Sequence, residues 1–167
     1  MSLAIPFEQI RPDDARIVGG KALALTRLVA EGIPVPAGLC VSTLAYRRYL
    51  SETRLGLRLR RELRRKPFED MRWEELWDTA LRIRAMFLNT PLSSDLQAEL
   101  VPMIDRQFAE RPVVVRSSAP GEDTARTSFA GLHDSFVNVR GTASILDHIR
   151  LVWASLWSDR ALLYRQE

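Results

Sequence analysis

Apolar residues recur at helical spacing in long segments of this chain, and this pattern constrains the fold most. One stripe comprises Trp73, Leu76, Trp77, Ala80, Leu81, Phe87 and Leu88, with Arg84 as its exception. A second comprises Ile145, Ile149, Val152, Trp153, Leu156 and Trp157. Such periodicity predicts amphipathic helices that each bury one face. The four tryptophans in these stripes are therefore expected in the core, although in a piece of a longer protein some of them should face the missing part and expose apolar surface.

Other segments predict further helices and several strands. Helices are expected at residues 22–31, 43–50, 54–65 and 94–108, and from 159 onward. Ser94 with Gln97 resembles a capping box, and Ser158 is expected to cap the last helix. Strands are expected at residues 39–41, 113–115 and 135–140, and the β-branched run at 113–115 is typical of burial on both faces. The expected class is α/β (mixed α+β), with a small mixed sheet flanked by amphipathic helices.

Length and composition exclude several classes of protein. The chain has 167 residues and is 46% hydrophobic, which suits one domain or a large piece of one and excludes disorder throughout. No apolar run approaches the roughly 18–20 residues of a membrane span, and the N-terminus is not a secretory signal. A single cysteine, Cys40, excludes a disulfide framework and is expected to be a buried small hydrophobe. These features fit a cytoplasmic protein.

The C-terminal end of the chain is expected to be cut from a longer protein, with an intact chain that frays at its end as the alternative. The last predicted helix reaches Glu167 without a stop signal, and domains rarely end inside such a pattern. Residues 1–3 resemble a cloning remnant. We therefore treat residues 1–167 as part of one domain.

The positive charge is concentrated in one segment. The net charge is only +3, yet Arg54–Lys66 carries seven positive charges and one negative. Such a segment could neutralise the phosphates of a nucleic acid or another polyanion. Leucines at 55, 57, 59 and 63 also allow one face to pack on the core while the arginines stay solvated. No aromatic residue lies in the run for base stacking, which disfavours nucleic acid.

Three segments could bind phosphate groups. Val18-Gly19-Gly20-Lys21 places two glycines and a lysine before a helix, whose first amides and positive dipole end suit an anion. Arg116 ends the apolar strand, where a guanidinium could grip phosphate in a bidentate manner. Small residues from Ser128 to Gly131, with Ser135 behind them, could fold over phosphates and donate their amides.

Each of these segments also has a plainer interpretation. A helix start with a surface lysine, an ion pair from Arg116 to Glu122 or Asp123, and an ordinary β-turn would explain them without a ligand. Glu122 and Asp123 could help to hold a metal, but adjacent carboxylates usually form a solvated loop, so no metal site is assigned. His133 and His148 are expected to be structural.

The order VGGK, VVVRSSAPGED, SFAGLHDSFVNVRG and WASLWSDRALLYR resembles the N-terminal part of the phosphoenolpyruvate synthase and pyruvate phosphate dikinase family. Rifampin phosphotransferase looks related in the same region. The likeness runs from about residue 17 to 165 and is strongest at 18–50 and 113–165. It implies the first half of an ATP-grasp nucleotide-binding domain.

The resemblance also implies roles for individual residues. Lys21 and Arg116 match residues that contact ATP, and Gly131 and Ser135 match the loop that covers the nucleotide. Gly19, Gly20 and Ser128 are weaker candidates for ATP binding. In this family ATP phosphorylates a histidine on a mobile domain, which carries the group to pyruvate. Neither His133 nor His148 lies in the family's Thr-x-His setting, so no catalytic residue is expected here.

Several functions remain open at this stage. The family implies ATP with Mg²⁺, whose ligands are expected beyond Glu167, together with a missing C-terminal half of the domain and a phosphohistidine domain. This chain alone is expected to be inactive. The family's Leu-Pro after Glu-Asp is absent, and Gly131–Asp134 replaces a glutamine-rich loop, which leaves pyruvate and an antibiotic open as acceptors. A polyanion-binding module or a regulatory module without the reaction are the alternatives.

Overall fold

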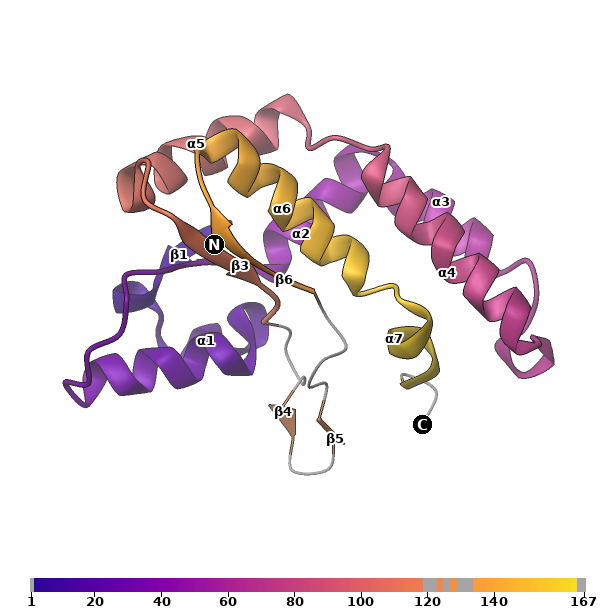
Figure 1. Cartoon of the computed structure of the whole chain (residues 1–167), viewed down its shortest axis with the longest axis horizontal. Coiled ribbons are helices and arrows are strands. Elements are labelled where there is room, and N and C mark those ends of the chain that lie inside the picture. The colour runs from indigo at the N-terminus through magenta and orange to yellow at the C-terminus, as the bar shows by residue number, and fades with distance from the viewer. Residues whose placement is uncertain (1, 119–122, 125–126, 129–133, 165–167) are drawn as a thin grey trace.

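The structure is a computed structural model that describes residues 2–118, 123–124, 127–128 and 134–164. Its helices are α1 (Ala15–Ala30), α2 (Thr43–Glu52), α3 (Leu55–Leu63), α4 (Trp73–Leu88), α5 (Ser94–Phe108), α6 (Thr142–Ser155) and α7 (Asp159–Tyr164). Short 3-10 turns are η1 (Phe7–Gln9), η2 (Pro12–Asp14) and η3 (Phe68–Asp70). The helices accompany short strands, which confirms the mixed α/β class (Figure 1).

The strands form separate antiparallel pairs rather than one mixed sheet. β1 (Ala4–Pro6) pairs with β2 (Leu39–Val41), β3 (Val113–Arg116) with β6 (Ser135–Val139), and β4 (Asp123–Thr124) with β5 (Thr127–Ser128). The β3–β6 register is irregular between Val113 and Val115. Ser2 and Leu3 extend the first pair, since Ser42 donates its amide to the Leu3 carbonyl and its hydroxyl to the Ser2 carbonyl.

Aromatic rings organise the main core between α2, α4 and α6. The ring of Tyr49 lies 5.2 Å from that of Trp153 and 6.0 Å from that of Phe87, centroid to centroid. The Tyr49 hydroxyl donates to the Thr90 carbonyl at 2.7 Å, which satisfies its buried polar atom. A smaller cluster lies under α1 and comprises Ile5, Ile10, Val18, Ala22 and Cys40. The predicted burial of Cys40 is thus confirmed.

The run at residues 113–115 is not buried on both faces, contrary to the sequence prediction. Val113 and Val115 pack against the main core, whereas Val114 is 56% exposed. Among the described residues β3 pairs with β6 alone, and α6 packs against this pair. The β-branched run therefore marks a strand that fits a half-buried sheet.

The four tryptophans divide between the core and the surface. Trp153 is buried and Trp157 is half-buried, but Trp73 and Trp77 are 61% and 47% exposed. The buried face of α4 shares Leu76, Ala80 and Phe87 with the predicted stripe but is shifted toward Thr79 and Ile83. The apolar stripe of this helix is thus wider than the face that the described core covers.

The helix ends agree with the sequence in part. Ser158 caps α7 as predicted, because its hydroxyl accepts from the Ala161 amide at 3.1 Å. The cap of α5 is Ser93 rather than Ser94, and its hydroxyl accepts from the Leu96 amide. The predicted capping box is wrong because the Gln97 side chain donates to the Leu92 carbonyl instead.

Helix α1 is broken at Gly19 and begins earlier than predicted. A first helical turn starts at Ala15, Gly19 then adopts φ 78° and ψ 169°, and the helix resumes through Ala30. Essentially only glycine adopts this backbone conformation, since a Cβ would clash with the neighbouring peptide groups. The sequence predicted glycines before a helix. The structure instead places them at a break within one.

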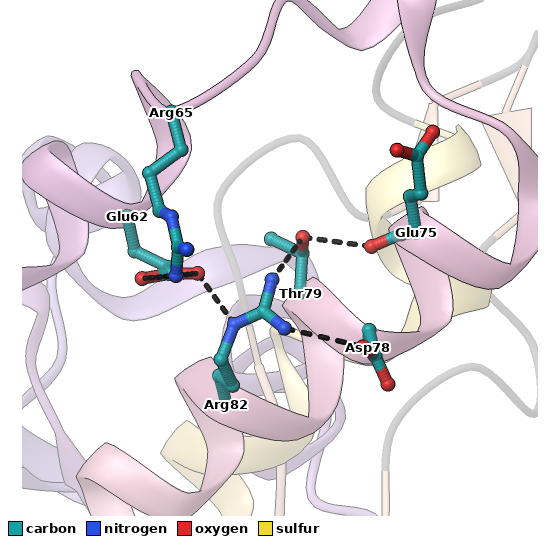
Figure 2. Close-up of polar contacts among 6 residues, drawn as sticks. All are labelled: Glu62, Arg65, Glu75, Asp78, Thr79 and Arg82. Carbon is teal, nitrogen blue, oxygen red and sulfur yellow. Dashed lines mark hydrogen bonds and ion pairs between the residues drawn. The ribbon is translucent and has the colours of Figure 1, made fainter.

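The arginine-rich segment forms α3, which packs on the core through Leu55 and Leu59. Leu57 was expected on that packed face, but it is 59% exposed because helical spacing turns it away. The C-terminal end of α3 carries Glu62, which is 8% exposed and accepts from the Arg82 Nε of α4 at 2.6 Å (Figure 2). This contact ties α3 to α4.

We expect Glu62→Gln to lower the free energy of unfolding by about 1–3 kcal/mol, because Arg82 loses a buried charged acceptor. Burial would raise the pKa of Glu62, but the hydrogen bonds and charges of Arg82 and Arg65 outweigh it and lower the pKa. The contribution is therefore present above the ordinary glutamate pKa and is lost as pH falls through the lowered one. Urea unfolding should show a smaller difference from wild type at about pH 3 than at about pH 7.

Asp78→Asn is the matched control for this prediction. Asp78 contacts the same arginine, at 3.3 Å, but its side chain is 62% exposed. An exposed pair contributes little, so this variant should stay within about 0.5 kcal/mol of wild type. Equal losses in both variants would contradict the importance of the buried contact.

We expect Gly19→Ala to destabilise the fold by about 1–3 kcal/mol, because alanine must adopt a strained backbone conformation. Gly56→Ala is the control, since Gly56 lies inside α3 and an added Cβ would meet Leu50 no closer than 3.5 Å. There the change should stabilise by about 0.4–1 kcal/mol. Thermal unfolding measures both, and a neutral Gly19→Ala would refute the strained break.

Candidate functional site

A single hydroxyl joins the glycine segment to the end of β3. Ser118 follows the strand by two residues, and its Oγ donates to the Val18 carbonyl at 2.8 Å. The same oxygen accepts from the Ala22 amide at 3.1 Å. These two backbone groups flank the break in α1. Two segments about a hundred residues apart in sequence are thus held together, and Figure 1 shows β3 leading toward α1.

This connection places two of the predicted phosphate-binding residues, Lys21 and Arg116, at the same junction. Lys21 lies in the first turn after the break and is half-buried. Arg116 is the last residue of β3 and is exposed. Because Ser118 binds the backbone on either side of Lys21, the two cations are anchored to one junction. Both residues are predicted from the sequence, which carries no signal for the contact that joins their segments.

Ser135 lies beside Arg116 across the sheet. The two residues are register partners at the ends of β3 and β6, and both are exposed. Directly opposed residues of an antiparallel pair have their Cβ atoms roughly 4.5–5.5 Å apart. The structure therefore brings Ser135 to the same strand end as Arg116, as a common site requires.

The structure describes only some of the other residues that were predicted to form a loop over the nucleotide. Ser128 is in β5, with Asp123 as its register partner, and Gly131 lies outside the described residues. The end of this loop is fixed at Asp134, whose amide donates to the buried Ser155 hydroxyl at 3.1 Å. Its carboxylate lies 3.7 Å from the Arg84 guanidinium. Arg84, the polar exception in the stripe of α4, thus contacts the loop end.

The thiol of Cys40 also contacts the broken helix. Its Sγ lies 3.5 Å from the Val18 carbonyl oxygen, which the Ser118 hydroxyl contacts as well. Burial raises the pKa of this thiol to about 12 and so keeps it protonated. A protonated thiol is a weak donor, which suits a second contact to that carbonyl.

Among the residues that the structure describes, the other chemistry-bearing side chains show no comparable arrangement. His148 Nδ1 lies 2.7 Å from the Ser144 carbonyl oxygen, and its ring packs edge-on against Phe136, as a structural histidine does. His133 and Glu122 lie outside the described residues. Within the described ranges, no group of three or more His, Cys, Asp or Glu residues could hold a metal ion.

The basic segment on α3 is partly occupied by contacts within the protein. Arg58 donates to the Thr90 hydroxyl, Arg65 to Glu62, and Lys66 to Glu75. Its arginines lie on the exposed side of an amphipathic helix. Separately, none of the helices in the described part of the chain combines the length and apolarity of a membrane span.

Comparison with known proteins places this chain in a family. The family model described as "Pyruvate phosphate dikinase, AMP/ATP-binding domain" matches residues 15–167. A probable phosphoenolpyruvate synthase of Methanothermobacter thermautotrophicus is 34% identical over 96% of this chain and 24% of its own length. The rifampicin phosphotransferase of Bacillus subtilis is 33% identical over 99% of this chain and 19% of its own.

A third relative is covered by this chain to a similar extent. The rifampicin phosphotransferase of a Streptomyces species is 38% identical over 98% of this chain and 19% of its own length. The chain thus spans about a fifth to a quarter of these relatives. Together with the family match over residues 15–167, they confirm the resemblance drawn from the motifs: this chain belongs to the family of the pyruvate phosphate dikinase AMP/ATP-binding domain.

Proposed function

We propose that this chain binds ATP at the junction of α1, β3 and β6 and forms the nucleotide-binding portion of a phosphotransferase. The observation that carries the proposal is the Ser118 contact, because it anchors Lys21 and Arg116 to one place. Lys21 and Arg116 bind the phosphates as a point charge and as a planar guanidinium. Phosphoryl transfer depends mainly on such positioning and on positive charge around the phosphates.

The backbone of α1 supports the same assignment. Residues 20–30 form a helical segment whose first amides point toward its start, and its dipole adds partial positive charge there. Gly20 is half-buried and lacks a side chain, so a phosphate can approach its backbone closely, whereas Gly19 is buried and serves the break in the helix. Ser135 contributes from β6, and Ser128 and Gly131 belong to the covering loop that the family resemblance implies.

The reaction of the whole protein is the further part of the proposal. ATP, with Mg²⁺, phosphorylates a histidine on another domain, which passes the phosphoryl group to pyruvate as in a phosphoenolpyruvate synthase. An antibiotic acceptor is the second candidate, because relatives named rifampicin phosphotransferase cover the chain equally well. On its own this chain binds nucleotide without turnover. The Mg²⁺ ligands are proposed to lie outside the described residues.

A polyanion-binding module is the alternative from another class. Its basis is the exposed basic side of α3, at a different place from the phosphate junction. Two features argue against it. Arg65 and Lys66 form ion pairs with Glu62 and Glu75, and the segment carries no aromatic residue for stacking.

A nucleotide titration tests the proposed site. Mg-ADP should shift the amide resonances of residues 19–21 and 116 saturably, whereas inorganic polyphosphate at equal phosphate concentration should not reproduce that pattern. Lys21→Ala and Arg116→Ala should each weaken binding about ten-fold or more, because each removes a charge-assisted phosphate contact. NMR shift mapping measures both quantities even at millimolar affinity.

The matched control is Arg61→Ala, which removes an exposed arginine of α3. It should leave the Mg-ADP affinity unchanged. Shifts that are confined to residues 54–66, equal for both anions and removed by salt would instead support the polyanion module. Near-normal turnover of Lys21→Ala or Arg116→Ala in a longer enzyme that contains this chain would refute the residue assignment.

A further inference from the structure

The break in α1 leaves a helix start whose cap residue has no side chain. With Gly19 as the cap, Gly20, Lys21 and Ala22 are the first three residues of the resumed helix. A helix cap normally accepts the second or third amide with a side-chain oxygen, and glycine has none to offer. The Ala22 amide is the third one here, and it donates to Ser118 Oγ at 3.1 Å.

The same hydroxyl also completes the turn before the break. In an unbroken helix the Ala22 amide would donate to the Val18 carbonyl, four residues earlier. Ser118 Oγ stands between these two groups, since it accepts from the amide and donates to that carbonyl. Val18, Gly19 and Ala22 are buried, so water does not readily replace either contact. Without the hydroxyl, buried backbone groups on both sides of the break would lose a partner.

We propose that Ser118 is a positioning residue of the nucleotide site, whose hydroxyl supplies the helix cap that Gly19 lacks and thereby fixes Gly20 and Lys21 relative to Arg116. The nucleotide part of this inference rests on the proposed function. The cap itself rests only on the two hydrogen bonds. It also gives the residue after Arg116-Ser117 a role distinct from phosphate binding.

The hydrogen-bonding capacity of serine separates this role from direct ligand contact. A hydroxyl has a single proton, and that of Ser118 is donated to the Val18 carbonyl. Phosphate oxygens need donors, so Ser118 has none left for a nucleotide while it bridges the break. Its effect on nucleotide affinity therefore passes through the backbone of residues 19–22.

Hydrogen exchange in the ligand-free chain tests the cap. Ser118→Ala should raise the exchange rate of the Ala22 amide about ten-fold or more relative to wild type, and Ser118→Thr, which keeps the hydroxyl, should restore it. Thr26→Val is the matched control, because Thr26 also bonds the backbone of α1, at the Ala22 carbonyl, but away from the break. It should leave the Ala22 amide rate unchanged. An unchanged rate in Ser118→Ala would overturn the cap.

Nucleotide affinity tests the positioning role. At a temperature where both proteins are fully folded, Ser118→Ala should raise the Kd for Mg-ADP about ten-fold, and Ser118→Thr should restore it. A residue that only stabilises the fold would lower the unfolding temperature and leave this Kd unchanged, which would overturn the proposal. If Ser118→Ala does not fold, Ser118→Cys takes its place, because a thiol is a weak donor and acceptor. It should weaken binding in the same direction, and unchanged affinity would again overturn the role.

The two levels of inference fail in different ways. Wild-type protein that shows no nucleotide-specific shifts would refute the proposed function and the positioning role together, while the exchange experiment would still decide the cap. Wild-type protein that binds Mg-ADP with the same affinity as Ser118→Ala would refute the positioning role alone.

Discussion

The hydrogen bonds of one serine hydroxyl across a broken helix are the interaction on which the candidate site depends. Gly19 breaks α1 because its backbone conformation is open essentially to glycine alone, and Ser118 then pairs with the groups on either side. A break in a buried helix leaves backbone groups that need partners. Ser118 supplies those partners, and its two hydrogen bonds also hold the end of β3 against α1. The same contact therefore satisfies the broken helix and sets the geometry of the candidate site.

The helical core gives this junction a fixed frame. Helix α6 packs against both β3 and β6, and its Trp153 belongs to the aromatic group around Tyr49. Arg116 and Ser135 are therefore placed by a strand pair that rests on the centre of the core. A ligand at their end of the pair would meet groups held by buried rings and backbone hydrogen bonds, which lowers the ordering cost of binding.

The sequence predicted the fold class and most helices, because periodicity and glycine positions are local signals. It also pointed to the segments of the candidate site, whose nucleotide-binding role stays a prediction. It did not predict which apolar side chains face the core: Trp73, Trp77 and Val114 are exposed, since burial depends on which elements pack together. Nor did it predict the role of Ser118. A serine that bonds backbone groups 96 and 100 residues away carries no local signature, and only the packing of β3 against α1 shows it.

Hydroxyl contacts fix both residues that bracket the segment from 119 to 133. Ser118 precedes it and is bonded to α1, while Asp134 follows it and donates its amide to the buried Ser155 of α6. Arg84 of α4 adds an ion pair at Asp134. The described residues on either side of this segment are thus bonded to α1 and to α6, and Arg116 and Ser135 lie next to them in sequence. A nucleotide at the proposed site would therefore lie beside Ser118 and Asp134, the two residues that bracket the segment which the family resemblance implies as the covering loop.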